Sequence, residues 1–197
     1  MMEARSLPAV MLLATAMLAP ATAIAPPMSL AGFVPMPPPT MPEPTLDAAQ
    51  EALVEHLARR YRVAVGPTGH IVRTAYRAAG RMNLDPLLVL AVISVESRFN
   101  PIAESGMGAR GLMQIIPKYH LEKLAEHGGE GAVLDPESNI LVGTRILREY
   151  VRRTGSLEAG LQFYNGAAWD ETARYTRKVL AERERLARVV EPARAGI

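Results

Sequence analysis

Residues 91–117 read AVISVESRFNPIAESGMGARGLMQIIP, and this stretch decides the fold. An apolar helical pattern ends in a lone carboxylate, Glu96, and a glycine-rich polar loop follows it. Upstream, Asp85 can accept hydrogen bonds from the free amides of a first helical turn, and Pro86 suits the first helical position. From Leu87 to Val95 every residue is apolar except Ser94, so this helix has no polar face. The pattern predicts a buried helix that carries Glu96 at its end.

Glu96 is the candidate acid catalyst of the chain. Partial burial disfavours the ionised carboxylate, and the negative end of the helix dipole repels its charge. Both effects raise the pKa and favour a proton donor, which contributes roughly 10²–10⁴-fold in rate when its pKa lies near the working pH. The alternative interpretation, a surface carboxylate at a helix end, fits poorly with the apolar residues before it.

A loop has to follow this helix, because the residue before Pro101 is driven towards extended geometry. Glycines at 106, 108 and 111 allow tight turns and close approach of a ligand to the backbone. Ser105 and Gln114 supply neutral hydrogen-bonding groups. Such groups suit a sugar.

The spacing of these residues resembles the signature of the soluble lytic transglycosylase family. The matching residues are Glu96-Ser97, Phe99-Asn100-Pro101, Ser105, Gly108-Ala109 and Gly111-Leu112-Met113-Gln114 up to Pro117. Farther along, Asp135-Pro136, Asn139-Ile140, Gly143 and Leu147 match as well, and we interpret them as packing residues. The resemblance covers residues 85–182 and implies an all-α, lysozyme-like domain that cleaves peptidoglycan glycan strands.

The resemblance also implies a mechanism and a set of site residues. In this lyase reaction Glu96 protonates the oxygen between N-acetylmuramic acid and N-acetylglucosamine and then, as a base, closes a 1,6-anhydro ring. Ser97, Ser105 and Gln114 would position Glu96 or the sugars. A Tyr-Asn pair, here Tyr164 and Asn165, faces the glutamate in this family, and Tyr175 matches another family tyrosine that either reaches the groove or packs in the core. After this pair the chain departs from the family, with Gly-Ala-Ala-Trp at 166–169.

Two other functions compete with this one. Glycosidases normally use a second carboxylate, and a hydrolytic muramidase would need a group that activates water. Glu104 is the nearest acidic candidate in sequence, whereas Asp135 fits a helix cap. The other rival is a non-catalytic wall-binding module of a secretion or conjugation machine, and the presence of Glu96 argues against it.

The composition excludes several classes of function. With 22 Lys and Arg against 20 Asp and Glu, charge gives no indication of a nucleic-acid partner. The chain has no cysteine, which excludes disulfides and thiolate metal sites. The four histidines lack ligand-like spacing, so we expect solvated histidines, no metal and no cofactor.

The N-terminal part of the chain indicates export. Residues 1–25 combine Arg5, an apolar run and small residues at 21–25, as in a cleaved signal peptide. Residues 26–44 are proline-rich and read as an extended linker. We therefore expect a periplasmic or wall-associated protein without a membrane-spanning segment after cleavage. Its expected partners are peptidoglycan strands and, by analogy with small exported members of the family, a cell-envelope-spanning secretion or conjugation machine.

The catalytic domain is expected over residues 45–190, with a frayed tail at 191–197. No segment alternates apolar and polar residues for long, which favours an all-α class. The first helix should start with Thr45 as its N-cap, and the second should run from about 69 to 83. Later helices should start after Asp135 and Ser156, and the last should run from about 170 to 190.

Overall fold

The computed structural model describes residues 45–195. The expected signal peptide, the linker up to residue 44 and residues 196–197 lie outside them. The described residues form helices without a named strand, which confirms the all-α class. The helices are α1 (Ala48–Tyr61), α2 (Val65–Met82), α3 (Pro86–Glu96), α4 (Leu121–Ala125), α5 (Pro136–Thr154), α6 (Leu157–Tyr164) and α7 (Arg174–Ala195), with 3-10 turns η1 (Pro117–Tyr119) and η2 (Glu130–Leu134).

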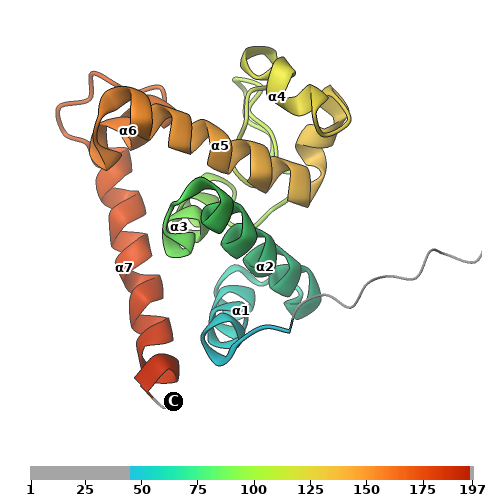
Figure 1. Ribbon diagram of the computed structural model, residues 1–197, viewed down its shortest axis with the longest axis vertical. Helices are drawn as coiled ribbons and strands as arrows, with labels where there is room; N and C mark the ends of the chain where they lie inside the picture. Colours follow the sequence, from blue (N-terminus) through green and yellow to red (C-terminus); the bar gives the residue numbers. More distant parts are fainter. Residues whose placement is uncertain (1–44, 196–197) are drawn as a thin grey trace, which may run out of the picture. The chain divides into compact units, whose positions relative to one another are not determined.

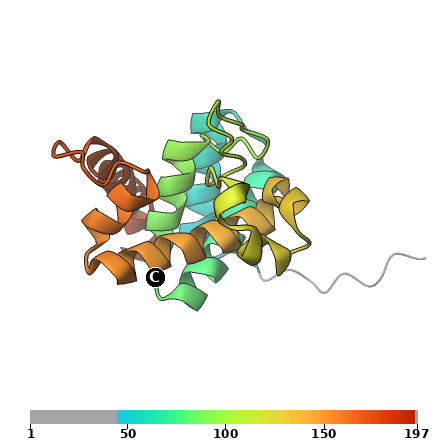
Figure 2. The ribbon, with the colours of Figure 1, turned by 90° about the horizontal axis from the view of Figure 1, so that it is seen from above.

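Helix α3 lies in the centre of this domain and packs between α2 and α7 (Figure 1). Its residues from Leu87 to Ser94 are all buried, as the absence of a polar face predicts. Asp85 accepts a hydrogen bond from the Leu87 amide, and Pro86 occupies the first position, which confirms the predicted start. Seen from above, α7 lies on one side of α3 and the α4 segment on the other (Figure 2).

The end of α3 is fixed by the residues that follow it. Ser97 is the C-cap, and Arg98 and Phe99 both have positive φ angles, 54° and 65°. A left-handed backbone at residues with side chains costs about 1–2 kcal/mol each. Phe99 offsets part of this cost because its ring is buried and stacks on Tyr61 at a centroid distance of 5.3 Å. The helix therefore ends at Glu96 because of the backbone at Arg98 and Phe99, and not because of Pro101 farther along the chain.

Three helix boundaries differ from the sequence prediction. The N-cap of α1 is Asp47 rather than Thr45, because Asp47 and Gln50 form a reciprocal capping box. Helix α2 begins at Val65 and includes Pro67 in its first turn, where the missing amide costs nothing. Helix α7 begins at Arg174, later than expected, and continues to Ala195, past the predicted end at 190.

The helices α5 and α6 start as predicted, with Asp135 and Ser156 as their N-caps. Between Pro117 and Leu134 the chain forms η1, α4 and η2 over a small apolar cluster. The cluster consists of Ile115, Leu124, Val133, Val142 and Ile146. Within residues 45–195, none of the helices combines the length and the hydropathy that a bilayer crossing requires.

Candidate active site

Glu96 is the last residue of α3, and its side chain is half-buried. Its Oε1 accepts a hydrogen bond of 2.5 Å from the hydroxyl of Tyr175, in the first turn of α7. Because α3 and α7 pack against each other, residues 79 positions apart meet here. Tyr175 therefore reaches the acid, and does so while its ring packs against the core.

Burial raises the pKa of Glu96 above its ordinary value of 4.5. The hydrogen bond from Tyr175 and the positive charge of Lys178 both act in the opposite direction, but burial is the largest effect. The pKa values of Tyr175 and Tyr164 are raised well above 10 by burial and by the nearby charge of Glu96. Both phenols consequently keep their protons, and Glu96 has the character of a proton donor.

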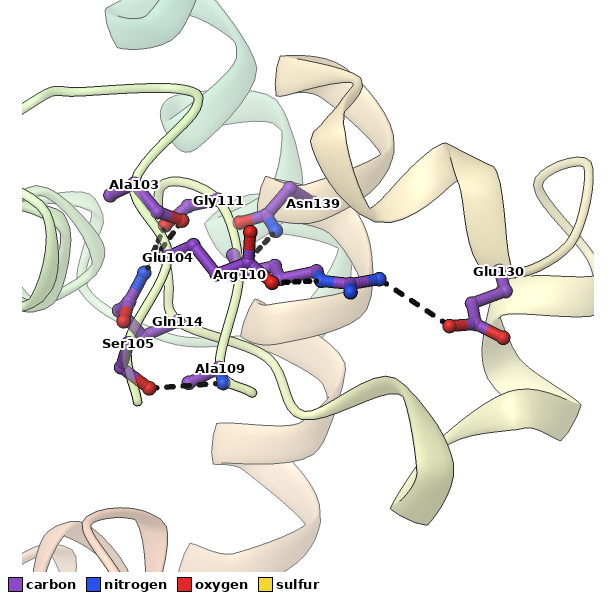
Figure 3. A network of polar contacts seen from close by, with 9 residues as sticks. All are labelled: Ala103, Glu104, Ser105, Ala109, Arg110, Gly111, Gln114, Glu130 and Asn139. Carbon is purple, nitrogen blue, oxygen red and sulfur yellow. Dashed lines mark hydrogen bonds and ion pairs between the residues drawn. The ribbon is translucent and has the colours of Figure 1, made fainter. Parts of the chain in front are cut away.

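No second carboxylate accompanies Glu96 within residues 45–195. The groups that shift its pKa are Tyr175 and Lys178. Glu104, the candidate from the sequence, binds the guanidinium of Arg110 at 2.9 Å and is largely exposed. Arg110 also pairs with Glu130, the first residue of η2, at 3.4 Å, so both acids belong to one ion-pair cluster around Arg110 (Figure 3).

The glycine-rich loop is held by its own polar groups. The Ser105 hydroxyl accepts from the Ala109 amide at 3.0 Å, which closes the turn that contains Gly106 and Gly108. The Gln114 amide group donates to the carbonyls of Ala103 and Gly111, at 3.2 and 3.1 Å (Figure 3). These two hydrogen bonds fix the Gln114 side chain and use only its NH2 group, so its carbonyl oxygen can still accept a hydrogen bond. The loop is therefore organised without a ligand.

Tyr164 connects this loop to the end of α6. Its hydroxyl donates to the Met113 carbonyl at 2.8 Å, and its ring meets Tyr150 edge-on at a centroid distance of 6.3 Å. Tyr164, Asn165 and Gln114 line a hollow of about 260 Å³ together with Tyr119 and Phe163, which we call the loop-side hollow. Tyr164 thus lies at the edge of a hollow, and its position in a substrate groove stays a prediction.

A second hollow, of about 390 Å³, lies on the other side of Asn165 and is called here the α7-side hollow. Asn165, Asp170, Tyr175 and Lys178 line it. Glu96 lines neither hollow and reaches the α7-side hollow through its bond to Tyr175. Asn165 borders both hollows, and Tyr164 lines the first and Tyr175 the second.

The predicted residues thus fall into two groups. Glu96, Tyr164 and Tyr175 come from three helices, and the charge of Glu96 contributes to the raised pKa values of both tyrosines. Gln114 and Asn165 line the hollows, whereas Ser105 lies within the loop. The buried hydroxyl of Ser97 donates to the Ile93 carbonyl at 3.1 Å. Its contribution is therefore to hold the last turn of α3, which carries Glu96.

Sequence reasoning gave two residues too little weight. Asn139 does more than pack, because its buried side-chain amide accepts from the Met113 amide and donates to the carbonyls of Arg110 and Val133. Nothing in the sequence distinguishes Lys178, because a lysine three residues after a tyrosine carries no signal of its own. Gly143, interpreted as a packing residue, makes room for Met113, since a Cβ there would lie 2.6 Å from the Met113 Sδ.

The expectation of solvated histidines is wrong for two of the four. The Nε2 of His56 and the Nδ1 of His120 are buried without a hydrogen-bond partner among the described residues. Burial lowers the pKa of both imidazoles. Within residues 45–195 no group of three or more histidines or acids is arranged to hold a metal ion.

Comparison with known proteins gives a match over most of this domain. Residues 73–183 match the model of the family described as "Transglycosylase SLT domain". A protein named "Transglycosylase", from Enterobacteria phage PRD1, is 39% identical over 108 residues, which is 52% of this chain and 39% of the phage protein. The soluble lytic murein transglycosylase of Escherichia coli K12 is 38% identical over 72 residues, 34% of this chain and 11% of that protein. The chain therefore spans well under half the length of these relatives.

Two solved structures share the fold. The 70 kDa soluble lytic transglycosylase from Escherichia coli superposes with a TM-score of 0.56 at 20% identity, over 75% of this chain and 31% of that one. An inactive mutant of the lytic transglycosylase Slt from Pseudomonas aeruginosa gives a TM-score of 0.53 at 22% identity, over 58% of this chain and 23% of the other. At these identities the likeness concerns the helical fold alone.

Proposed function

Because the chain belongs to the family defined by the transglycosylase SLT domain, we propose that it is a peptidoglycan lytic transglycosylase. The proposed reaction cleaves the β-1,4 bond between N-acetylmuramic acid and N-acetylglucosamine. The observation that carries the proposal is the state of Glu96, a half-buried carboxyl with a raised pKa, hydrogen-bonded to Tyr175, which lines the α7-side hollow. These are the properties of a general acid.

In the first step, protonated Glu96 donates its proton to the glycosidic oxygen. The carbon–oxygen bond breaks, N-acetylglucosamine leaves with that proton, and positive charge develops on the muramic acid ring. The acetamido group of the same sugar stabilises this charge. Glu96 is then ionised, and the hydrogen bond from Tyr175 stabilises it because that bond favours the charged carboxylate.

In the second step, Glu96 acts as the base. It removes the proton from the C6 hydroxyl of muramic acid, whose oxygen attacks the anomeric carbon and closes the 1,6-anhydro ring. No water is consumed, and Glu96 regains its proton for the next turnover. A single carboxylate is sufficient for this cycle, in agreement with the pairing of Glu104 to Arg110 on the loop surface.

The neighbouring residues position the acid and the sugars in this proposal. Gln114 and Asn165 line the hollows, and their side-chain amides would offer hydrogen bonds to sugar hydroxyls or acetamido groups. Tyr164 provides a ring wall, fixed through Met113. Ser105 shapes the loop, and Ser97 holds the turn that carries Glu96.

A hydrolytic muramidase remains the second candidate, since it would use the same acid with a bound water. The absence of another carboxylate beside Glu96 within residues 45–195 favours the anhydro reaction over this candidate. The third candidate is a wall-binding module of a secretion or conjugation machine. The raised pKa of Glu96 supports catalysis instead, because binding alone gives no reason to bury a carboxyl there.

Peptidoglycan as the substrate places the proposed activity in the periplasm or at the cell wall. We also propose that the signal peptide expected at 1–25 directs export. The enzyme would then open the wall for the assembly of an envelope-spanning secretion or conjugation machine. Normal assembly of such a machine in a strain that lacks the gene would count against the latter.

The test is mass spectrometry of the fragments that the protein releases from purified peptidoglycan, with Glu96→Gln as the control. Non-reducible fragments, one water lighter than hydrolytic ones and absent with the variant, are the expected result. Reducible fragments would identify a muramidase. A Glu96→Gln protein that releases as much as the wild type would refute the catalytic assignment.

A further inference from the structure

A third hollow, of about 380 Å³, opens between the end of α1, the last turn of α3 and α7. Four basic side chains line it, from Arg60, Arg98, Lys178 and Arg185, and one carboxylate, from Glu182. We call it the cationic hollow. Lys178 also lines the α7-side hollow, so the cationic hollow adjoins the candidate active site.

The positive charge of this hollow exceeds what its own acid neutralises. The Glu182 side chain is only 7% exposed, and it binds Arg185 as well as Arg60, the latter at 3.6 Å. The Tyr61 hydroxyl donates to the same carboxylate at 3.3 Å. Arg98 and Lys178 are exposed and have no ion-pair or hydrogen-bond partner in the described part of the chain. Two positive charges are therefore available to a ligand.

The spacing along α7 places this charge next to the acid. Tyr175, Lys178, Glu182 and Arg185 recur at intervals of three and four residues, so they share one face of the helix. At a rise of about 1.5 Å per residue, Lys178 lies one turn and Arg185 about 15 Å beyond the Tyr175 that binds Glu96. A strand bound at Glu96 can thus extend a charged branch along α7.

We propose that the cationic hollow binds carboxylates of the peptide stems that peptidoglycan carries on its muramic acid residues. This inference rests on the proposed function. The glycan itself is neutral, and the stem carboxylates are the anions that such a substrate presents. A guanidinium group binds a carboxylate through two parallel hydrogen bonds, and an ammonium group binds it as a point charge. The chain accordingly cleaves strands with charged stems in preference to strands whose stems are neutral.

The experiment compares two substrates that differ only in charge. Soluble glycan strands with intact stems are used either with free carboxylates or after conversion of these carboxylates to amides. We expect the full chain to cleave the free-carboxylate strands with a kcat/KM about fivefold higher at low salt, mainly through KM. The preference should fall at high salt, because the screening length drops to about 3 Å at 1 M.

The variant Arg98→Gln removes one unpaired charge of the hollow without breaking an ion pair. It should lower the ratio of the two kcat/KM values towards one. Arg152→Gln is the matched control, because Arg152 is exposed on α5 and does not line the hollow. A wild-type chain without preference, or an Arg98→Gln chain with the wild-type ratio, would overturn the proposal.

A binding measurement separates this inference from the proposed function. Calorimetry with the Glu96→Gln chain and soluble muropeptides, free or amidated, reports charge recognition without cleavage. Tighter binding of the free form, lost in the additional Arg98→Gln variant, supports the cationic hollow even if the wild type releases no anhydro products. Equal binding of both forms refutes the inference even if the wild type is an active transglycosylase.

Discussion

Replacing Asn139 by alanine should be among the most damaging changes to the site that leave its lining residues intact. The Asn139 side chain is fully buried in α5. Its Oδ1 accepts from the Met113 amide at 2.7 Å, and its Nδ2 donates to the carbonyls of Val133 and Arg110, at 2.7 and 3.1 Å (Figure 3). One side chain thus holds the glycine-rich loop and the end of η2 on α5.

The expected loss of stability follows from these three hydrogen bonds. Each contributes about 1 kcal/mol net, and each backbone group left buried without a partner costs about 1–3 kcal/mol. The Arg110 carbonyl keeps its hydrogen bond from the Ile115 amide, so only the Met113 amide and the Val133 carbonyl lose the partner that Asn139 provides. We therefore expect Asn139→Ala to lower the free energy of unfolding by about 3–5 kcal/mol. For a domain of this size that corresponds to a fall in Tm of about 10 °C.

Urea unfolding, with Tm as a second measurement, tests this value. Asn139→Asp keeps the acceptor for Met113 but sets a carboxylate against two carbonyl oxygens, so near neutral pH it should be at least as unstable as Asn139→Ala. Asn100→Ala is the matched control, because Asn100 is exposed and its side chain accepts one bond, from the Ile102 amide at 3.1 Å. A cost for Asn139→Ala no larger than for Asn100→Ala, or a stable Asn139→Asp, would refute the reasoning.

Three other predictions concern the site. Burial raises the pKa of Glu96 in the folded chain above its value in the unfolded chain. The protonated carboxyl therefore contributes its full stability below the unfolded pKa, and this contribution is lost as pH rises through the folded pKa. Glu96→Gln should unfold at a higher temperature than the wild type above neutral pH and at a similar temperature in acid. Tyr175→Phe removes a bond that lowers this pKa, so the alkaline limb of the pH–activity profile should move upward and kcat should fall about tenfold or more. Trp169, the single tryptophan, is 93% exposed and directly precedes Asp170, which lines the α7-side hollow. Iodide should therefore quench its fluorescence, and less strongly when glycan binds to the Glu96→Gln chain.

Each of these predictions can fail independently. A lower Tm for Glu96→Gln than for the wild type at every pH would show that burial does not disfavour the carboxylate. An unshifted alkaline limb in Tyr175→Phe would separate the tyrosine from the acid. Iodide quenching of Trp169 that saturating glycan leaves unchanged would place the bound strand away from the loop at 165–173.

The centre of the fold could be predicted because several local signals agree there. Asp85, Pro86 and the apolar run up to Val95 indicate the same helix, and α3 has these bounds. The start of α1 could not be predicted, because Thr45 and Asp47 are both good N-cap residues. Only the reciprocal hydrogen bonds between Asp47 and Gln50 decide between them. The start of α7 depends likewise on Asp170, whose carboxylate binds the amides of Thr172 and Arg174 and delays the helix.

The candidate site also contains residues that the sequence predicts and residues that it does not. Glu96 could be found from the sequence because its local context, a polar residue at the end of an apolar helix, is visible in one stretch. Its partners are not local, since Tyr175 comes from a helix 79 residues later and Lys178 from the next turn of that helix. The family resemblance pointed to Tyr175 but left packing as an equal alternative. A contact of this kind depends on how α3 and α7 pack, which no residue spacing encodes.

If both proposals hold, one face of α7 would connect the pKa of Glu96 with the choice of substrate. Burial in the domain makes Glu96 a weaker acid, whereas Tyr175 and Lys178, one turn apart on α7, make it stronger. The same face continues to Glu182 and Arg185 in the cationic hollow. A stem carboxylate bound at Lys178 would partly cancel the positive charge that lowers the pKa of Glu96, and so favour its protonated form. In this arrangement a charged strand would itself help to keep the acid protonated before cleavage, and an amidated strand would not.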